Sequence, residues 1–277
     1  MTEKIAAVVF DWAGTIVDFG SLAPMGAFVR LFARHGVHIS IEQARVPMGL
    51  PKLAHIEALG AMPAVASQWQ VAKGQPFGHA DASALLEEFV PMSAQSALER
   101  ADFIPGFLSI YPCLQAHHIR VATTTGYTRK IMEPLIQRAA AEGFHPERVI
   151  CCDDVALSRP SPLGMLACME TLGVSGRPEL VVKVDDTAPG IAEGLSAGCW
   201  TVGVAASGNA LGWSWEEWQS ADAARKGAAL SSAQSALRQA GAHEVIDSVA
   251  QLQRALNAIE ARIALGERPD DTQRHAG

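Results

Sequence analysis

Residues 5–15 read IAAVVFDWAGT, an apolar run that ends in the aspartate Asp11. An unbroken apolar run of this length is typical of a strand that is buried on both faces of a parallel sheet. Asp11 is therefore expected at the carboxyl end of a buried strand. A carboxylate in that position can attack an electrophile or bind a metal ion.

Four further apolar runs resemble buried strands: IRVAT (119–123), RVICC (148–152), LVVKV (180–184) and TVGV (201–204). Helical patterns separate the later ones, which predicts an α/β fold with a doubly wound parallel sheet. EVIDSV (244–249) indicates one more strand or a short docking segment. Polar residues should gather at the carboxyl ends of the strands, where such sheets bind ligands. They are Asp11, Thr123–Thr125, Arg159, Asp185 and Asp186.

More than a hundred residues with little strand character separate the first two runs, too many for a simple loop. Helix signals mark this stretch. Ser40 and Gln43 fit a capping box, Pro51 fits a first helical position, and residues 85–101 predict a helix that Pro91 could bend. The motif IPG at 104–106 then marks the return to the sheet.

These signals divide the chain into two domains and a tail. Residues 1–19 and 102–265 are expected to form a discontinuous core, and residues 20–101 an inserted helical cap domain over the sheet. Residues 266–277 are expected to be a disordered tail.

Composition limits the classes of protein to consider. The 277 residues are 49% hydrophobic and carry a net charge of −7, which favours a globular chain over a nucleic-acid or membrane surface but permits a small anionic substrate. Five cysteines without metal-finger spacing indicate reduced thiols. No secretory pattern or apolar run of roughly 20 residues is found, so we expect a soluble cytoplasmic protein.

PMGLPKLAHIEAL (47–59) places Lys52 in the first turn of a predicted helix and His55 three residues later on the same face. An ordinary lysine has a pKa of about 10.4, so only about one lysine amine in a thousand is neutral near neutral pH. A Schiff-base lysine therefore needs burial or a positive helix terminus to lower its pKa. The competing interpretations are a solvated surface lysine and a packed histidine.

Five motifs in combination carry a resemblance: DWAGT, PMGLPK, TTGYTR (124–129), SRPSP (158–162) and KVDDTAPG (183–190). Between about residues 5 and 210 the chain resembles the phosphonoacetaldehyde hydrolase (phosphonatase) family of the haloacid dehalogenase superfamily. The resemblance implies hydrolysis of phosphonoacetaldehyde to acetaldehyde and phosphate, with Mg2+, in the degradation of 2-aminoethylphosphonate. It also implies a homodimer.

The resemblance explains one difference between this chain and the phosphatases of the superfamily. Phosphatases of the superfamily place a general acid two positions after the first aspartate, where this chain has Ala13. A carbon–phosphorus bond has no bridging oxygen to protonate, so its cleavage needs an electron sink instead. An imine formed by Lys52 supplies that sink while Asp11 attacks phosphorus, with His55 as the expected proton shuttle.

The resemblance also implies the metal ligands: the Asp11 carboxylate, the Ala13 carbonyl and Asp186. Neighbouring strand residues point to opposite faces, so Asp185 is not expected to bind the ion together with Asp186. This chain has Asp185 where relatives commonly have glycine, and Gly190 where they commonly have aspartate. Asp185 could therefore replace the missing carboxylate in support of the metal site, or merely cap a turn.

Five residues are expected at the substrate. Thr125 and Gly126 precede a predicted helix and could cradle phosphate, or simply cap that helix. Arg159 could bridge phosphoryl oxygens, or form a surface ion pair. Met48 and Tyr127 match the family pattern near the substrate. Ser21 stands where relatives often have cysteine, and the adjacent Asp153 and Asp154 are interpreted as structural.

Two other functions stay open at this point. Another capped hydrolase of the superfamily, a phosphomonoesterase or a dehalogenase, would make Lys52 incidental. A catalytically silent binding protein is disfavoured by the set Asp11, Lys52, Arg159 and Asp186.

Overall fold

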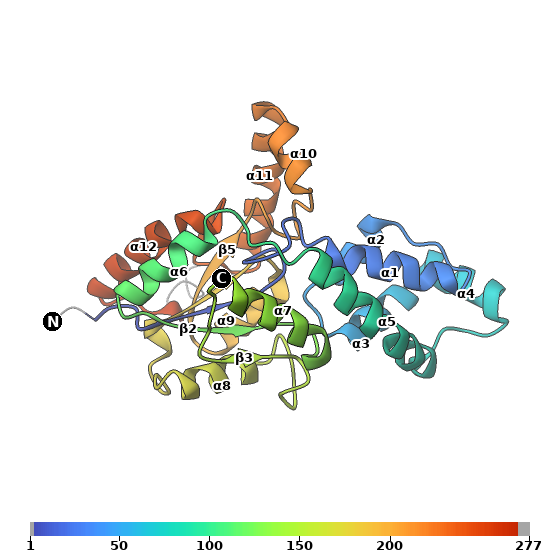
Figure 1. Cartoon of the computed structure of the whole chain (residues 1–277), viewed down its shortest axis with the longest axis horizontal. Helices are drawn as coiled ribbons and strands as arrows, with labels where there is room; N and C mark the ends of the chain where they lie inside the picture. Colours follow the sequence, from blue (N-terminus) through green and yellow to red (C-terminus); the bar gives the residue numbers. More distant parts are fainter. Residues whose placement is uncertain (1–2, 271–277) are drawn as a thin grey trace.

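The computed structural model describes residues 3–270, and a parallel sheet lies at its centre (Figure 1). Its strands are β1 (Ala7–Phe10), β2 (Arg120–Thr124), β3 (Val149–Ile150), β4 (Val181–Asp185), β5 (Trp200–Val204) and β6 (Glu244–Ile246). The order is β3-β2-β1-β4-β5-β6. The chain therefore builds outward from β1 in both directions, which confirms the doubly wound α/β prediction and places the topological switch beside Asp11.

Side-chain alternation along β1 divides the core between the two faces of the sheet. Val8 and Phe10 pack in one apolar cluster with α6 (Phe107–Ala116), α7 (Arg129–Ala141) and α12 (Leu252–Ala264). Ala7 and Val9 pack in a second cluster with α8 (Leu163–Thr171). Because both faces are covered, the strands can be apolar throughout, as the sequence predicted.

Strand β3 is shorter than the predicted 148–152. Asp154 Oδ2 accepts a hydrogen bond from the N–H of Cys151 at 2.7 Å, and the N–H of Cys152 donates to the carbonyl oxygen of Tyr127 at 3.0 Å. These bonds turn the chain away from the ladder. The predicted strand at 244–249 is present as β6, and all five cysteines are free thiols.

Five helices lie together to one side of the sheet, and we call this group the cap (Figure 1). They are α1 (Ala23–Arg34), α2 (Ile41–Arg45), α3 (Lys52–Gly60), α4 (Pro63–Lys73) and α5 (His79–Glu99). The Ser40 and Gln43 capping box is confirmed. Pro51 is the N-cap of α3 rather than its first residue, and α5 begins six residues before the predicted helix and continues through Pro91.

The two links between cap and core run side by side. Val17 and Phe103 form an antiparallel bridge, and the N–H of Asp18 donates to the carbonyl oxygen of Asp102 at 3.3 Å. Gly20 has φ of +87°, and a Cβ there would lie 2.1 Å from the carbonyl oxygen of Trp213. The exact domain boundaries stay a prediction.

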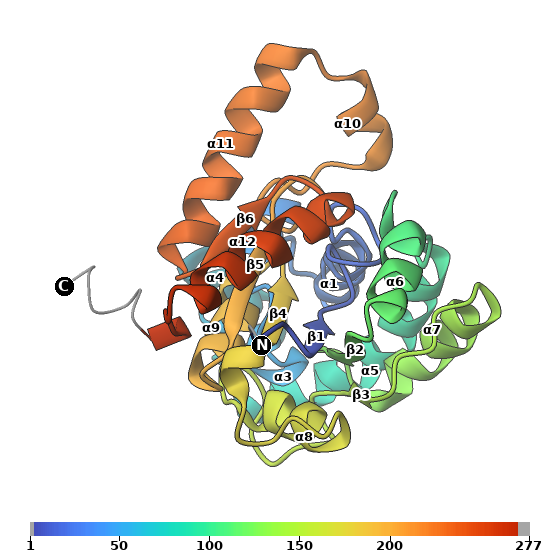
Figure 2. The same cartoon turned by 90° about the vertical axis from the view of Figure 1, so that its left-hand side faces the viewer.

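Helices α10 (Trp215–Ser220) and α11 (Ala223–Gln239) project from the rest of the fold (Figure 2). Helix α9 (Ala188–Ser196) follows β4. Of the expected tail, residues 266–270 are placed, with Glu267 Oε2 2.8 Å from Arg262 Nε; residues 271–277 lie outside the described residues. Within residues 3–270, no helix is long and apolar enough to cross a membrane.

Candidate active site

A cavity lies at the carboxyl ends of β1 and β2, and both the core and the cap contribute to its wall. The core supplies Asp11, Ala13, Thr125, Gly126, Tyr127, Arg159 and Thr187. The cap side supplies Ser21, Pro24 on α1, Met48, Gly49 and Lys52 at the start of α3. Most of the predicted site residues therefore meet in one place, although they come from stretches more than a hundred residues apart.

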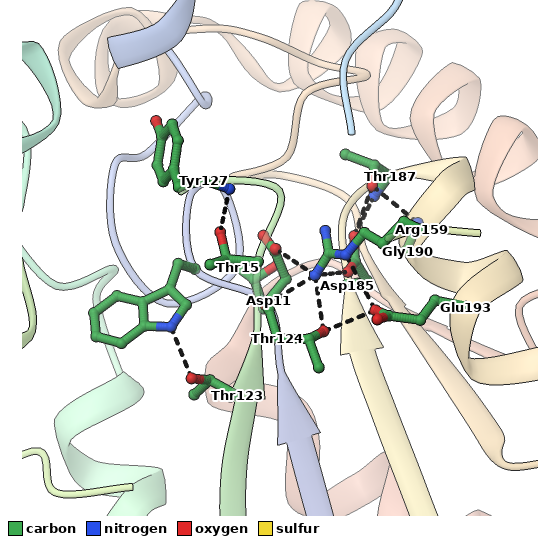
Figure 3. A network of polar contacts seen from close by, with 12 residues as sticks. Asp11, Thr15, Thr123, Thr124, Tyr127, Arg159, Asp185, Thr187, Gly190 and Glu193 are labelled. Atoms are coloured by element: carbon green, nitrogen blue, oxygen red, sulfur yellow. Dashed lines mark hydrogen bonds and ion pairs between the residues drawn. The ribbon is translucent and has the colours of Figure 1, made fainter. Parts of the chain in front are cut away.

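Asp11 directly follows β1 and is buried. Its Oδ1 lies 2.8 Å from Arg159 Nη2 (Figure 3). Burial raises the pKa of Asp11 to about 6, and repulsion from Asp185 adds to this, while the Arg159 guanidinium opposes it. Asp11 is thus an ionised but poorly hydrated carboxylate near neutral pH, which suits a nucleophile.

Arg159 is buried and held from several sides, so the surface ion-pair interpretation is wrong. Its Nε lies 3.1 Å from Glu193 Oε2, and its Nη2 donates to the carbonyl oxygen of Thr124 at 2.8 Å and lies 3.4 Å from Asp185 Oδ2. These contacts fix the guanidinium plane beside Asp11 (Figure 3). A planar donor fixed in this way is suited to bind phosphoryl oxygens.

Lys52 is not a surface lysine: its side chain is buried, with 4% of the residue exposed, at the start of α3. Its Nζ lies 4.8 Å from the centre of the Tyr127 ring and 5.9 Å from that of Phe28. Burial lowers the pKa of Lys52 to about 8, opposed by the charges of Cys152 and Asp11. The amine is therefore far more often neutral than an ordinary lysine amine.

His55 is buried behind Lys52 and is not part of the cavity wall. Its Nε2 lies 2.9 Å from the carbonyl oxygen of Ala44, so we place the proton there, and its ring stacks on Phe28 at 4.0 Å. Burial and the neighbouring Lys52 charge lower the pKa of His55 well below its usual value. These contacts favour the packing interpretation, and the proton-shuttle role stays a prediction.

Three carboxylates converge at the switch point. Asp11, Asp185 and Asp186 each place one oxygen within 4.8 Å of the others, and all three are buried. Asp185 and Asp186 do not point to opposite faces as two residues within a strand would, because β4 ends at Asp185. Mg2+ prefers oxygen ligands such as carboxylates, so the type of ligand gathered here fits this cation.

Asp186 is built into a tight turn. Its Oδ1 accepts from Thr15 Oγ1 at 3.1 Å and its Oδ2 from the N–H of Asn209 at 2.8 Å. A Cβ at Gly14, where φ is +86°, would lie 2.4 Å from Asp186 Oδ2, so the glycine of DWAGT makes room for this carboxylate. Burial, then Asp11 and Asp185, raise the pKa of Asp186 well above its usual value. A divalent cation would offset that repulsion.

The threonine-rich turn after β2 carries the predicted phosphate-binding residues. Thr125 and Gly126 precede α7, which begins at Arg129. The N–H of Tyr127 donates to Thr125 Oγ1 at 3.2 Å. Nearby, Asp153 accepts from the N–H of Arg129 at 2.8 Å and Asp154 pairs with its guanidinium, so both aspartates support the start of α7, as predicted.

Sequence reasoning missed two buried charges beneath the site. Glu193 on α9 pairs with Arg159 and accepts from Thr124 Oγ1 at 2.7 Å. Lys183 Nζ lies 3.1 Å from Asp185 Oδ2 and donates to Thr124 Oγ1 at 2.6 Å. A lysine inside the apolar run VVKVD was the available signal, since a buried ammonium requires partners.

The fold and this set of residues define the class of protein. The family model for haloacid dehalogenase-like hydrolases matches residues 5–198. A β-phosphoglucomutase from Clostridium difficile has the same fold, with a TM-score of 0.66, 16% identity and coverage of 94% of this chain and 99% of the other. The chain is thus a hydrolase of the haloacid dehalogenase-like type.

Proteins with higher sequence identity identify the family within this class. A phosphonoacetaldehyde hydrolase from Paraburkholderia phytofirmans is 46% identical over 96% of this chain and 100% of its own length, and one from Aeromonas hydrophila is 42% identical over 97% and 96%. The crystal structure of a phosphonoacetaldehyde hydrolase-like protein from Oleispira antarctica has a TM-score of 0.95 and 38% identity, over 97% of each chain. The chain belongs to the phosphonoacetaldehyde hydrolase family of haloacid dehalogenase-like hydrolases.

Proposed function

We propose that this hydrolase cleaves the carbon–phosphorus bond of phosphonoacetaldehyde, giving acetaldehyde and phosphate. The observation that carries the proposal is a buried lysine, Lys52, that shares one cavity with Asp11 and Arg159. A phosphate monoester needs no amine for its hydrolysis. An aldehyde beside the phosphonate gives Lys52 a chemical role.

The first step is imine formation. With a pKa of about 8, roughly a fifth of the Lys52 side chains are neutral near pH 7.4, against about one per thousand for an exposed lysine. The neutral amine attacks the aldehyde carbon and water leaves. The nitrogen is then protonated and positive, and its imine carbon is separated from phosphorus by one methylene.

The second step breaks the carbon–phosphorus bond. Asp11 attacks phosphorus, and the electron pair of the bond moves through the methylene carbon to the imine nitrogen, which gives an enamine on Lys52 and a phosphoryl group on Asp11. No leaving oxygen has to be protonated, which is consistent with Ala13 in the acid position. Arg159 lies beside Asp11 to bind the transferring group, with Thr125 and Gly126 in the same wall.

The last steps return the free enzyme. Water hydrolyses the aspartyl phosphate to phosphate and Asp11. Protonation of the enamine carbon regenerates an imine, and its hydrolysis releases acetaldehyde and Lys52. We propose that Met48 and Tyr127, which line the cavity, pack against the aldehyde half of the substrate.

The carboxylate cluster fits Mg2+. Asp11, Asp186 and the Ala13 carbonyl would hold the ion, which when bound would neutralise charge on the phosphonate and the attacking carboxylate. Asp11 and Ala13 both line the cavity, and Asp186 lies within 4.8 Å of Asp11 by the carboxylate oxygens.

A substrate panel tests the proposal. Phosphate release should be fast from phosphonoacetaldehyde with Mg2+ and negligible from phosphate monoesters and from phosphonates that lack the aldehyde. Preference for a phosphate monoester would instead support the capped phosphomonoesterase, and halide release from a haloacid would support the dehalogenase. Failure to turn over any of them would support a binding protein.

The proposal also covers the assembly of the protein, its location and the pathway in which it acts. We propose a homodimer, which light scattering coupled to gel filtration would test. We place the reaction in the cytoplasm, in agreement with the free thiols. We place it in the degradation of 2-aminoethylphosphonate, after a step that converts the amine to the aldehyde.

A further inference from the structure

Gly190 is a glycine whose backbone does not require glycine. It lies buried in the first turn of α9 and is not among the residues with positive φ, and alanine is normally preferred inside a helix. The reason for glycine is space. A Cβ at this position would lie 1.9 Å from Oδ2 and 2.1 Å from Cγ of Asp185, so the Asp185 carboxylate occupies that volume.

The Asp185 carboxylate cannot easily move aside for such a Cβ. Its Oδ1 accepts from the N–H of Thr187 at 2.9 Å and from Thr187 Oγ1 at 2.8 Å. Its Oδ2 lies 3.1 Å from Lys183 Nζ. The same oxygen lies 3.4 Å from Arg159 Nη2 (Figure 3). Because Asp185 is fully buried, moving it would take one carboxylate partner away from each of two buried cations.

These contacts connect Asp185 to both halves of the chemistry. Arg159 Nη2 is shared between Asp185 and Asp11, so Asp185 helps to fix the guanidinium that meets the nucleophile. The bonds to Thr187 close the turn that carries Asp186. Oδ1 of Asp185 accepts two hydrogen bonds from Thr187, and Oδ2 lies within ion-pair distance of Lys183 and Arg159 without a hydrogen-bond partner among the described residues. The side chain is therefore suited to position these groups.

We propose that Asp185 and Gly190 are a coupled pair, in which Asp185 is the positioning carboxylate for Arg159 and for the metal-binding turn, and Gly190 supplies its space. Relatives that follow the family pattern have glycine at the position of Asp185 and aspartate at the position of Gly190. In them, the aspartate on the helix that corresponds to α9 would place its carboxylate in the same buried volume. The inference rests on the proposed function for the roles of Arg159 and Asp186, and it is independent of the chemistry at Lys52.

Exchange of the two residues tests the pair. Asp185→Gly, Gly190→Asp and the double variant are compared with the wild type by isothermal titration calorimetry with Mg2+ alone and by the melting temperature of the metal-free protein. Each single change should weaken Mg2+ binding about tenfold and lower the melting temperature. Asp185→Gly removes the carboxylate, and Gly190→Asp forces two carboxylates into one buried volume. The double variant should recover to within about threefold of the wild-type Mg2+ affinity.

A matched control separates position from charge. Asp185→Gly combined with Ala188→Asp has the same charge as the exchanged protein, but Ala188 is exposed on the same turn. This control should stay as weak as Asp185→Gly. If Gly190→Asp does not fold, Gly190→Ala adds only the Cβ and should be harmful with Asp185 and harmless with Asp185→Gly.

Additive losses in the double variant, or equal recovery by Ala188→Asp, would overturn the inference. Failure of the wild type to bind Mg2+ would overturn the role at the metal site. The titrations need no turnover. Absence of phosphonoacetaldehyde hydrolysis would therefore remove the proposed function and still leave the coupling of the two residues measurable.

Discussion

Arg159 Nη2 lies 2.8 Å from Asp11 Oδ1, and both side chains are buried at the end of β1. A buried aspartate is normally hard to keep ionised, and the pKa of Asp11 is raised to about 6. The guanidinium opposes that rise and lines the same cavity as Asp11. One contact thus connects the charge of the proposed nucleophile to the group that we propose binds phosphate.

Asp11→Asn should lower phosphate release by more than about a thousandfold, since an amide is a far weaker nucleophile and a poorer metal ligand. Imine formation on Lys52 should survive, because the amine is untouched. Phosphate release is measured by a colorimetric assay, and imine formation by reductive trapping. Near-normal phosphate release would exclude Asp11 as the nucleophile.

Arg159→Lys keeps the positive charge but cannot contact Asp11, Glu193 and the Thr124 carbonyl at once. We expect kcat/KM to fall about 100-fold, by about 2.7 kcal/mol of transition-state stabilisation. Arg129→Lys, at a partly exposed ion pair outside the cavity, is the matched control and should stay near wild type. Equal losses in the two variants would contradict the role of Arg159.

Asp186→Ala should weaken Mg2+ binding by about 100-fold or abolish activity, since it removes a proposed ligand. Asp185→Ala should be milder, about tenfold, because it removes a positioning group. Activity titrated with Mg2+ provides the comparison. If Asp185→Ala is inactive and Asp186→Ala is not, the metal assignment is reversed.

The rate of reductive trapping by acetaldehyde and cyanoborohydride should rise with pH and level off above about pH 8. Burial disfavours the ammonium form of Lys52 and lowers its pKa to about 8, so the neutral amine already dominates above that pH. Below it, the rate should fall about tenfold per pH unit. A rate that keeps rising to about pH 10 would show an ordinary, exposed lysine.

Much of the fold could be predicted because strands such as β1 and β4 are largely apolar and have polar residues at their carboxyl ends. The runs at 5–10 and 180–184 give the strands β1 and β4, and the polar residues after them meet at one edge of the sheet. Parallel topology makes that convergence a consequence of the pattern. The length of β3 was not predicted, because the apolar run continues to Cys152, whereas the N–H of Cys152 bonds to the carbonyl oxygen of Tyr127 in a distant segment.

It was harder to predict that the site is buried than to predict which residues form it. Lys52, Arg159 and Asp186 were identified from motifs, but a motif does not state that α3 covers the sheet and removes Lys52 from water. The dependence of Asp185 on Gly190 was visible only as two departures from the family pattern, and the contact between them requires the turn after β4. Glu193 was missed because it lies in no motif, and Lys183 because it was interpreted as part of the apolar run of a strand.

Lys52→Arg tests the requirement for an amine. Arginine keeps the charge and most of the length of the side chain but forms no stable imine. The variant should neither be trapped nor turn over substrate. Lys73→Arg, at an exposed lysine on α4, is the matched control and should behave as wild type.

The most direct measurement is peptide mapping after borohydride is added with phosphonoacetaldehyde. Borohydride reduces an imine to a stable secondary amine, so the enzyme should lose activity irreversibly and carry the added mass on Lys52. A fully active Lys52→Arg variant, or an added mass on another lysine with Lys52 unmodified, would contradict the electron-sink mechanism and leave the absence of an acid at Ala13 unexplained.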